Sequence, residues 1–292
     1  MLVLDIGGTK VAAARWTDGA LHGRRQWPMP ATLQGWRETL AAMAGAYPEP
    51  DRVAAAVTGV TDGQVLSAVN RQLISFWDGY ALADALTQVW HCPAVLLNDA
   101  QAAAWGEYHA GGRRAGNLLF LTLSTGVGGG LVLDGRLRTG PRGLAGHIGH
   151  VSATCAPPDD THLCGCGRPD CLEILASGTA LARQASQLSG RPLDAPAVFA
   201  GWQAGDPVCV RLVTAAAQAV AQELANAHAL LDLDEVRLGG SVGLADGMLA
   251  AVTLAQSALP ALFRVPVAAA RLGVDAGLIG VGHWASDRLA AG

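Results

Sequence analysis

The sequence has little charge and almost no lysine. Only 15% of its 292 residues are charged, against roughly 25% in an average soluble protein, and Lys10 is the sole lysine. Lysine and arginine number 20 and aspartate and glutamate 24, so the formal net charge is −4. Binding to nucleic acid depends largely on neutralising phosphates with basic side chains, and no basic field is available here. We therefore expect no nucleic-acid partner.

Long uninterrupted apolar runs are also missing. Glycine, aspartate or arginine interrupts each apolar stretch well short of the ~20 residues that span a bilayer. The segment Met1–Asp5 has neither the basic region nor the cleavage site of a signal peptide. Hydrophobic residues make up 51% of the chain, which excludes disordered and collagen-like proteins. These features predict a cytoplasmic globular protein without a membrane partner.

One succession of segments occurs twice. The apolar run Leu2–Ile6 is followed by a glycine turn, the apolar stretch Val11–Trp16 and an Asp18-Gly19 turn. The same succession begins again at Leu118–Leu123 and ends at Asp134-Gly135. Such repetition predicts two strand–turn–strand units, one per domain, although two unrelated hairpins would give the same pattern.

The remainder alternates between helical and extended patterns. Helices are expected near 33–46, 80–90, 100–109, 207–231, 244–258 and 277–290, and strands near 52–57, 94–97, 236–238 and 265–269. This alternation predicts an α/β fold with mixed sheets. The stretch 143–173 fits neither period and is expected to be an irregular insert. We place the domain change near Asn117.

The first glycine turn has the composition of a phosphate site. Gly7 and Gly8 lack a Cβ atom, so backbone N–H groups can approach an anion closely. A carboxylate such as Asp5 tolerates a neighbouring phosphate when Mg²⁺ lies between them, which predicts Asp5 on the metal side and Thr9 as a hydroxyl donor. An ordinary hairpin turn is the structural alternative. Neither turn matches the Walker or dinucleotide-binding pattern.

The dipeptide Asn98-Asp99 stands between an expected strand and an expected helix. Both residue types are preferred at helix N-caps. Asp99 would also lie at the carboxyl end of a strand, where ligands bind in open α/β sheets. There it could accept the proton of a substrate hydroxyl during phosphoryl transfer. The capping and catalytic interpretations are compatible.

Three thiols lie within the eight residues 164–171. Cys164, Cys166 and Cys171 are separated by glycines and fit a tetrahedral Zn²⁺ site that lacks one ligand. A closed four-ligand site would be structural, and reduced metal-free thiols are the alternative. The candidates for the fourth ligand are His150, Cys155 and His162.

Expectations also follow for Glu173 and for other cysteines and histidines of the chain. A zinc ion bound to these thiols would bring His147, His150 and Glu173 close together. Polar side chains grouped in this way are suited to hydrogen-bonding a polyhydroxylated ligand. Cys92 and Cys209 lie in apolar segments and are expected to be inert core residues. Structural roles are expected for His22, His91, His109, His228 and His283.

The ordered set of motifs resembles the ROK family of sugar kinases and repressors. The motifs are residues 5–10 (DIGGTK), 98–103 (NDAQAA), 124–130 (STGVGGG), 146–150 (GHIGH) and 164–173 (CGCGRPDCLE). This resemblance implies the actin-like ATPase fold, with two RNase H-like domains around a cleft and a zinc-binding insert at 143–173. It implies a first lobe of residues 1–117 plus 277–292 and a second lobe of residues 118–276.

The resemblance also implies roles for individual residues. Asp99 would be the catalytic base, and His150 would complete the zinc site of Cys164, Cys166 and Cys171. The sugar would be bound by Gly59, Asn70, Asn98, Asp99, His147, His150 and Glu173. The phosphates of ATP and its Mg²⁺ would be bound by Asp5, Gly7, Gly8, Thr9 and Lys10, with Thr125 and Gly126 in a second phosphate loop and Gly239-Gly240-Ser241 near the adenosine.

Two positions depart from the usual family pattern. His147 stands where glucose-phosphorylating members usually carry glutamate, and Gln101 replaces a frequent asparagine. The stretch Gly143–His150 resembles that of the members that phosphorylate N-acetylmannosamine. The resemblance therefore implies an ATP-dependent homodimeric kinase that converts N-acetylmannosamine to its 6-phosphate in sialic acid catabolism.

Three alternatives remain. One is a kinase of glucose or fructose, and another is a sugar-binding protein without catalysis. The third is a sugar-responsive repressor. It is disfavoured because only four residues precede Asp5, which leaves no room for a DNA-binding module, and because the net charge is acidic.

Overall fold

The computed structural model describes residues 1–63, 65–67, 76–153 and 163–290, and the chain divides into two compact units. Unit 1 consists of Met1–Arg113, Leu137–Ala145 and Val274–Gly292, and unit 2 of Arg114–Arg136 and Gly146–Gly273. The lobe limits that the resemblance implies remain predictions.

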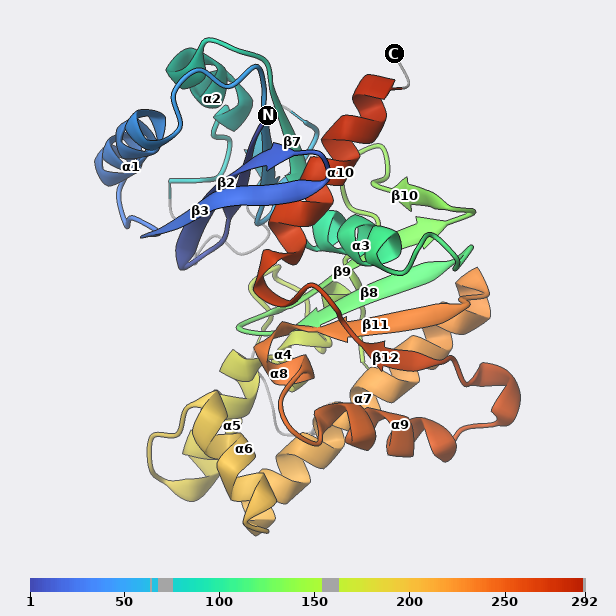
Figure 1. Ribbon diagram of the computed structural model, residues 1–292. Helices are drawn as coiled ribbons and strands as arrows, with labels where there is room; N and C mark the ends of the chain where they lie inside the picture. The colour runs from blue at the N-terminus through green and yellow to red at the C-terminus, as the bar shows by residue number, and fades with distance from the viewer. Residues whose placement is uncertain (64, 68–75, 154–162, 291–292) are drawn as a thin grey trace. The chain divides into compact units, whose positions relative to one another are not determined.

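Unit 1 contains the elements from β1 to α3 together with the C-terminal helix α10 (Figure 1). They are β1 (Leu2–Ile6), β2 (Lys10–Thr17), β3 (Ala20–Pro28), α1 (Leu33–Ala46), β4 (Val53–Val57), β5 (Val60–Thr61), β6 (Leu66–Ser67), α2 (Leu82–Trp90), β7 (Ala94–Asn98), α3 (Asp99–Ala110) and α10 (Ala276–Ala290).

The main sheet of unit 1 has the order β3-β2-β1-β4-β7. The strands β3, β2 and β1 are antiparallel neighbours, whereas β1, β4 and β7 run parallel. Ile6 pairs with Val57, and Val57 pairs with Asn98. The three parallel strands therefore end at the same level, and the residues that follow them share one edge of the sheet.

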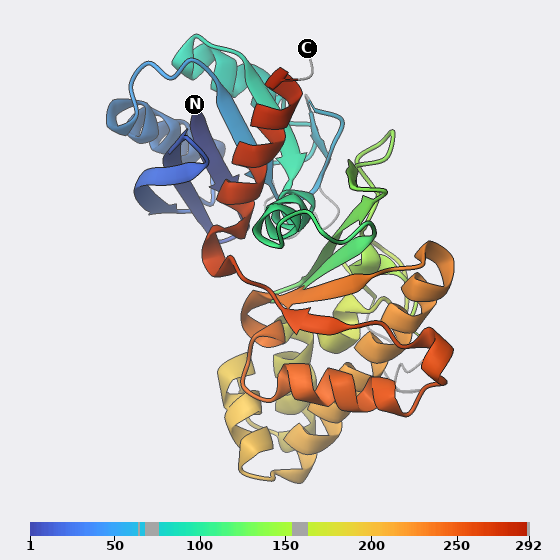
Figure 2. The ribbon, with the colours of Figure 1, turned by 45° about the vertical axis from the view of Figure 1, so that its right-hand side comes forward.

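Both faces of this sheet are covered by helices. Leu2 and Leu4 point to the side covered by α1 and α2, whereas Val3 points to the side of α3 and α10. Because both faces are buried, β1 is apolar at nearly every position instead of alternating with polar residues. Helices α3 and α10 pack side by side (Figure 2).

The packing of α3 on α10 is close. A Cβ atom at Gly280 would overlap the carbonyl of Ala102, so the two backbones can approach this closely only with glycine there. The rings of His109 and His283 stack with their centroids 4.0 Å apart. These two histidines have packing partners within unit 1.

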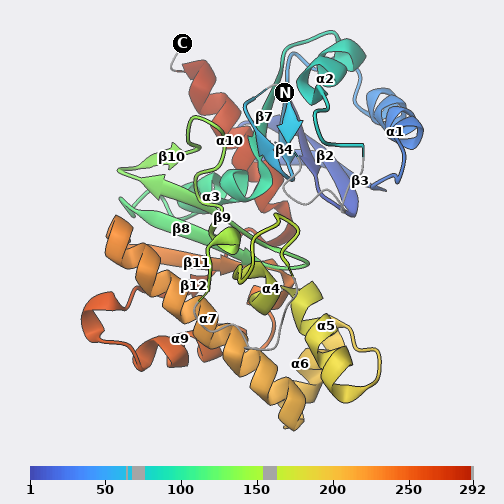
Figure 3. The ribbon, with the colours of Figure 1, turned by 180° about the vertical axis from the view of Figure 1, so that it is seen from behind.

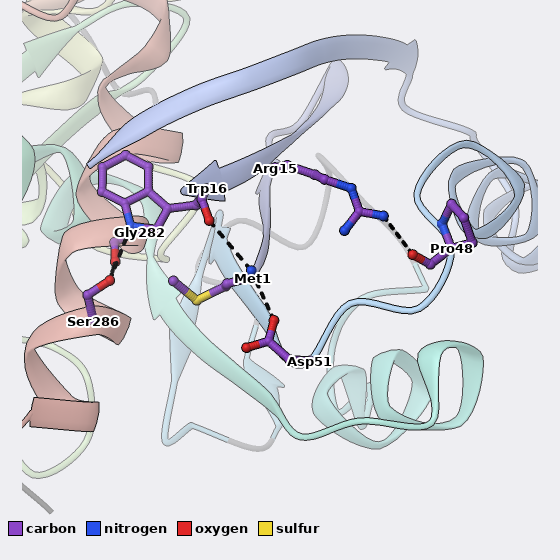
Figure 4. A network of polar contacts seen from close by, with 7 residues as sticks. All are labelled: Met1, Arg15, Trp16, Pro48, Asp51, Gly282 and Ser286. Atoms are coloured by element: carbon purple, nitrogen blue, oxygen red, sulfur yellow. Dashed lines mark hydrogen bonds and ion pairs between the residues drawn. The ribbon is translucent and has the colours of Figure 1, made fainter. Parts of the chain in front are cut away.

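Helix α10 is also joined to strand β2. The indole Nε1 of Trp16 donates to the Ser286 hydroxyl over 3.1 Å, and that hydroxyl donates to the Gly282 carbonyl over 2.8 Å (Figure 4). In the same region the Met1 amine forms an ion pair with Asp51 over 2.9 Å. The bond from Trp16 to Ser286 holds the C-terminal helix on the N-terminal sheet.

Unit 2 repeats the strand order of unit 1. Its sheet has the order β10-β9-β8-β11-β12, with β8 antiparallel to β9 and parallel to β11, and β11 parallel to β12. The predicted repetition is therefore confirmed. The elements within unit 2 are β8 (Leu118–Leu123), β9 (Val127–Leu133), α4 (Glu173–Ala176), α5 (Gly178–Ser189), α6 (Ala195–Gln203), α7 (Pro207–Leu231), β11 (Glu235–Gly239), α8 (Gly240–Gly243), α9 (Met248–Ser257) and β12 (Val267–Ala269), with short 3₁₀ helices at Ile148–His150 and Ala261–Phe263. The strand β10 (Arg136–Arg138) and the 3₁₀ helix Gly273–Asp275 begin with the last residue of a unit 2 segment and continue into unit 1.

Helices α7 and α9 cover one face of the second sheet (Figure 3). Among the described residues, α7 is long and apolar enough to cross a membrane by length and composition alone. However, 61% of its most apolar window is buried, and the carboxylate of Glu223 lies inside. The composition of α7 is accounted for by its position in the core of unit 2.

Two details differ from the sequence-based expectations. The helix expected at 244–258 extends only over Met248–Ser257, because Gly247 adopts φ +85° immediately before it. Helices α5 and α6 were not expected, although each begins with a capping side chain, Ser177 and Asp194 respectively.

Candidate active site and metal centre

The turn between β1 and β2 leaves room for an anion. The Gly7 N–H donates to the Lys10 carbonyl over 3.0 Å and closes the turn. Apart from its two chain neighbours, no residue in the described ranges has an atom within 4 Å of the position that a Cβ of Gly8 would take, and Thr9 is exposed. The turn therefore has the open backbone that a phosphate cradle requires.

Asp5 is a carboxyl group that a cation would stabilise. Burial, followed by the nearby Asp99 carboxylate, raises its pKa to about 7. Lys10 and Arg24 act in the opposite direction, and Asp275 raises the pKa further. Oxygen ligands of this kind are preferred by Mg²⁺, so the donor set beside the turn fits that ion.

Asp99 is held at the first position of α3. The Ala100 N–H donates to its Oδ1 over 2.8 Å, and the Asn98 amide donates to the same oxygen over 3.1 Å. The Asn98 side chain caps the helix by accepting the Gln101 N–H over 3.0 Å, and it also donates to the Gly59 carbonyl over 3.0 Å. Asn98 is therefore the cap, while Asp99 is fixed in orientation.

The environment of Asp99 raises its pKa to about 6, with burial as the main cause and the hydrogen bonds from Ala100 and Asn98 opposing it. At neutral pH the group is ionised, yet its proton affinity is higher than that of an ordinary aspartate. Those are the properties of a general base.

Asp5 and Asp99 lie at one edge of one sheet. β4 separates β1 from β7, so the backbones of these two strands lie two strand spacings apart, roughly 10 Å. Gly59 follows β4 at this edge with φ +102°. Asp5, Gly59, Asn98 and Asp99 thus stand at or near this edge, and Asp99 directly follows β7, the strand end at which it was expected.

The second glycine turn, between β8 and β9, is held by groups outside it. The Ser124 N–H donates to the Gly126 carbonyl over 2.9 Å, and the Ser124 carbonyl accepts the Gly178 N–H over 2.7 Å. The Val127 N–H donates to Oε2 of Glu173 over 3.1 Å. This turn therefore depends on α4 and α5 for its shape.

Four side chains of unit 2 converge on one point. The ligand atoms of His150, Cys164, Cys166 and Cys171 all lie within 4.8 Å of one another. The Cys164 Sγ lies 3.5 Å from the His150 Nδ1, and the Cys166 and Cys171 sulfurs are 3.6 Å apart. Zn–S and Zn–N bonds of usual length set tetrahedral edges of about 3.8 Å between sulfurs and about 3.5 Å between sulfur and nitrogen. The cluster fits a zinc ion.

Burial disfavours the charged forms of the three ligands with shifted pKa values. Burial raises the pKa of the Cys171 thiol to about 11 and also raises that of Cys164. Burial lowers the pKa of His150, which keeps the imidazole neutral. A bound cation would reverse the cost of forming buried thiolates. The Arg168 guanidinium donates to the His150 carbonyl over 2.7 Å and anchors that ligand.

Glu173 connects the metal cluster with the second glycine turn. Its Oε1 lies 3.6 Å from the Cys164 sulfur, while Oε2 accepts the Val127 N–H. The rings of His147 and His150 are nearly parallel, with centroids 6.4 Å apart. A Cβ atom at Gly149 would overlap the Val127 carbonyl, so the histidine segment lies directly on β9. Unit 2 thus gathers the predicted His147, His150 and Glu173.

Some predicted residues cannot be placed in this way. Asn70, Cys155 and His162 lie outside the described residues. Gly239 and Gly240 join β11 to α8, and Gly240 has φ +83°. No role was expected for Gln101, whose side chain donates to three backbone carbonyls. A long amide side chain in an otherwise alanine-rich helix was the available signal.

Comparisons with known proteins extend over the whole chain. The model of the ROK family matches residues 1–288. The chain is 45% identical over 294 residues to N-acetylmannosamine kinase of Yersinia pseudotuberculosis serotype O:1b (strain IP 31758), covering 99% of each chain. It resembles the crystal structure of ROK hexokinase from Thermus thermophilus with a TM-score of 0.84 at 35% identity, covering 100% of both chains.

A further similar structure is the ROK family glucokinase from Streptomyces griseus in complex with glucose and AMPPNP. Its TM-score is 0.82 at 29% identity, with 98% of this chain and 99% of the glucokinase covered. These similarities confirm the predicted fold class, an α/β chain of the actin-like ATPase type, and the cysteine cluster fits the expected insert.

Proposed function

Because the chain belongs to the ROK family, we propose that it transfers the γ-phosphoryl group of ATP to the C6 hydroxyl of N-acetylmannosamine, giving the 6-phosphate. The observation that carries this proposal is the 45% identity to the Yersinia N-acetylmannosamine kinase over 99% of both chains. Identity to the hexokinase and glucokinase is lower, at 35% and 29%. Such a product would enter sialic acid catabolism.

Asp99 acts as the base in this proposal. Its Oδ1 is fixed by the Ala100 N–H and the Asn98 amide, so the carboxylate keeps one orientation while the sugar binds. Its raised pKa favours accepting the proton of the C6 hydroxyl as the oxygen attacks phosphorus. Asn98 and Gly59 contact the sugar beside it, and Asn70 is assigned to the sugar by resemblance alone.

The β1–β2 turn binds the phosphates of ATP. Gly7, Gly8 and Thr9 offer N–H and hydroxyl donors, and the Lys10 ammonium adds a positive charge. Asp5 holds the Mg²⁺ that accompanies ATP, either directly or through water. When bound, that ion neutralises charge that develops on the transferred phosphoryl group.

In unit 2 we assign Thr125 and Gly126 to the phosphates and Gly239 and Gly240 to the adenosine. Sugar hydroxyl groups are assigned to Glu173, His147 and His150. In this proposal His150, Cys164, Cys166 and Cys171 hold a structural Zn²⁺, since four protein ligands leave no position for a substrate. The ion's role is to fix Glu173 and the histidine segment.

The proposal includes the setting in which the enzyme works. A kinase that depends on ATP is expected in the cytoplasm, and the family resemblance favours a homodimer. Size-exclusion chromatography with light scattering measures the molar mass and so tests the homodimer directly.

The test is a coupled ADP-release assay on the purified protein with N-acetylmannosamine, N-acetylglucosamine, mannose, glucose and fructose. We expect the highest kcat/KM with N-acetylmannosamine and identification of the 6-phosphate by NMR. A higher kcat/KM for glucose or fructose would refute the substrate assignment and leave sugar kinase activity intact. No ADP release with any sugar would refute the kinase proposal.

A further inference from the structure

Gln101 is a buried amide in the first turn of α3, two residues after Asp99, and only 1% of it is exposed. Its Nε2 lies 2.9 Å from the Ala145 carbonyl, 3.1 Å from the Gly143 carbonyl and 3.4 Å from the Thr139 carbonyl. All three acceptors belong to residues 139–145, a segment of unit 1 without regular secondary structure. One buried side chain thus joins this segment to the helix that begins with Asp99.

The segment 139–145 has a second contact with unit 1. Gly143 has φ +72°, and a Cβ atom there would overlap the carbonyl of Thr61 in β5. The Ala145 N–H donates to the Thr139 carbonyl over 3.1 Å, so the ends of the segment are joined to each other. Gln101 on one side and Thr61 on the other therefore set the position of a compact loop.

The same glutamine is bonded to the residues around Asp99. Its backbone N–H donates to Oδ1 of Asn98, and the amide of Asn98 donates to the Gly59 carbonyl and to Asp99. The network links three stretches of chain, residues 59–61, 98–101 and 139–145. Within the described part of the chain, no hydrogen bond of this network reaches the β1–β2 turn.

The geometry points to Gln101 as a positioning residue for the sugar, a role that rests on the proposed function. Two of the stretches that it joins contain Gly59, Asn98 and Asp99. The third ends two residues before His147 in the sequence. Without the amide, the carbonyls of the 139–145 loop lose their donor and the loop no longer has a fixed position relative to Asp99. Sugar binding should weaken while ATP binding is unchanged.

The test is the variant Gln101→Met, which keeps the length and burial of the side chain and removes its donors. We expect the KM for N-acetylmannosamine to rise about tenfold, because small displacements of binding groups are costly. The KM for ATP should stay within twofold of the wild type. Hydrogen exchange measured by mass spectrometry should become faster in the peptide containing residues 139–145.

Asn117→Leu is the matched control. Asn117 precedes β8, at the end of that strand away from the second glycine turn, and its Nδ2 donates to the carbonyls of Leu231 and Asp232 over 3.2 Å and 3.0 Å in unit 2. This variant loses the same kind of bond to backbone carbonyls and should leave both KM values and exchange at 139–145 unchanged. The same KM rise in Asn117→Leu, or equal rises for sugar and ATP in Gln101→Met, would overturn the positioning role.

Gln101→Asn is a second variant in case Gln101→Met does not fold. Its shorter side chain keeps a carboxamide donor, and we expect a sugar KM between those of the wild type and Gln101→Met, with exchange at 139–145 faster than in the wild type. Wild-type sugar KM and wild-type exchange in Gln101→Asn and Gln101→Met alike would overturn the inference. A wild type inactive on every sugar would instead count against the proposed function, and the exchange data would still test the contact.

Discussion

The two glycine turns stand at the same place in two sheets of the same strand order, yet they differ in charge. The first turn contains Lys10 and follows Asp5, so its charged groups are part of the repeated unit itself. No charged residue lies between Ser124 and Gly130 in the second. That turn obtains its carboxylate from Glu173, which accepts the Val127 N–H.

The difference shows how each unit positions the carboxylates near its glycine turn. In unit 1 Asp5 lies near the end of β1 and Asp99 directly follows β7, so both carboxylates are carried by one sheet. In unit 2 the corresponding group stands next to a cysteine cluster in an irregular insert, so its position depends on that cluster. The first arrangement should tolerate loss of a metal ligand in unit 2, whereas the second should not.

The largest expected effect is that of Asp99→Asn in unit 1. Removing the base should lower kcat by about a thousandfold, within the range known for general base catalysis, because no other group then takes the hydroxyl proton. The affinity for the sugar should change little, as measured by isothermal titration calorimetry. Asp51→Asn is the control, because that carboxylate is 77% exposed and its ion-pair partner is the N-terminal amine. Near-normal turnover in Asp99→Asn would remove it from the base role.

The next effect concerns the cluster in unit 2. Cys171→Ser should lose stoichiometric zinc, measured by mass spectrometry of the metal, and lower kcat/KM for the sugar roughly a hundredfold, as changes around metal sites can. Cys209→Ala, at a buried thiol of α7 outside the cluster, should keep its zinc. A wild-type protein without zinc at full activity would contradict the dependence of Glu173 on the cluster.

A smaller effect comes from adding a methyl group to each turn. At Gly126 the new Cβ would lie 2.7 Å from Oε2 of Glu173, so Gly126→Ala must displace that carboxylate. We expect about a tenfold rise in the sugar KM, since a 1 Å displacement can cost still more. Gly8→Ala meets no protein atom within 4 Å and should keep the wild-type melting temperature, raising mainly the KM for ATP. Equal effects of the two variants on the sugar KM would erase the contrast between the turns.

The smallest effect is one of pH. The pKa of Asp99 is raised to about 6, and the base must be ionised, so activity should fall as the pH falls through that value. At saturating Mg²⁺ and ATP we expect kcat/KM for the sugar to reach half its plateau near pH 6. If kcat/KM instead reaches half its plateau near pH 4, burial does not raise the pKa of the catalytic Asp99. The residual kcat/KM of Asp99→Asn should not show this fall with decreasing pH.

Much of the strand framework of both units could be predicted from the sequence. The buried runs at Leu2–Ile6 and Leu118–Leu123 and the Asp-Gly turns after them carry strong local signals, and the structure has strands and turns at these positions. The cap at Asn98 was also predictable, because it is a contact between residues three apart. Helices α5 and α6 were missed, and their capping residues were the signal available.

One part of the zinc cluster could be predicted from the spacing of residues in the sequence, and the other part depends on the fold. Three thiols within eight residues indicated a metal site without any structure. Spacing left His150 as one of three candidates and the family resemblance favoured it, and the fold places its Nδ1 3.5 Å from the Cys164 sulfur. Sequence spacing cannot decide between ligands that reach the ion from another segment.

The sequence by itself determined the repeated strand units, the phosphate-type turns, the carboxylate after β7 and the thiols, because each depends on residues close together in the chain. Only the tertiary structure decided that Glu173 supports the second turn and that Gln101 holds residues 139–145. Those contacts join segments about 40 to 50 residues apart, as between Gln101 and Ala145 or Val127 and Glu173. Their partners are backbone groups, which every residue has, so the identity of the side chains carries no signal of the pairing.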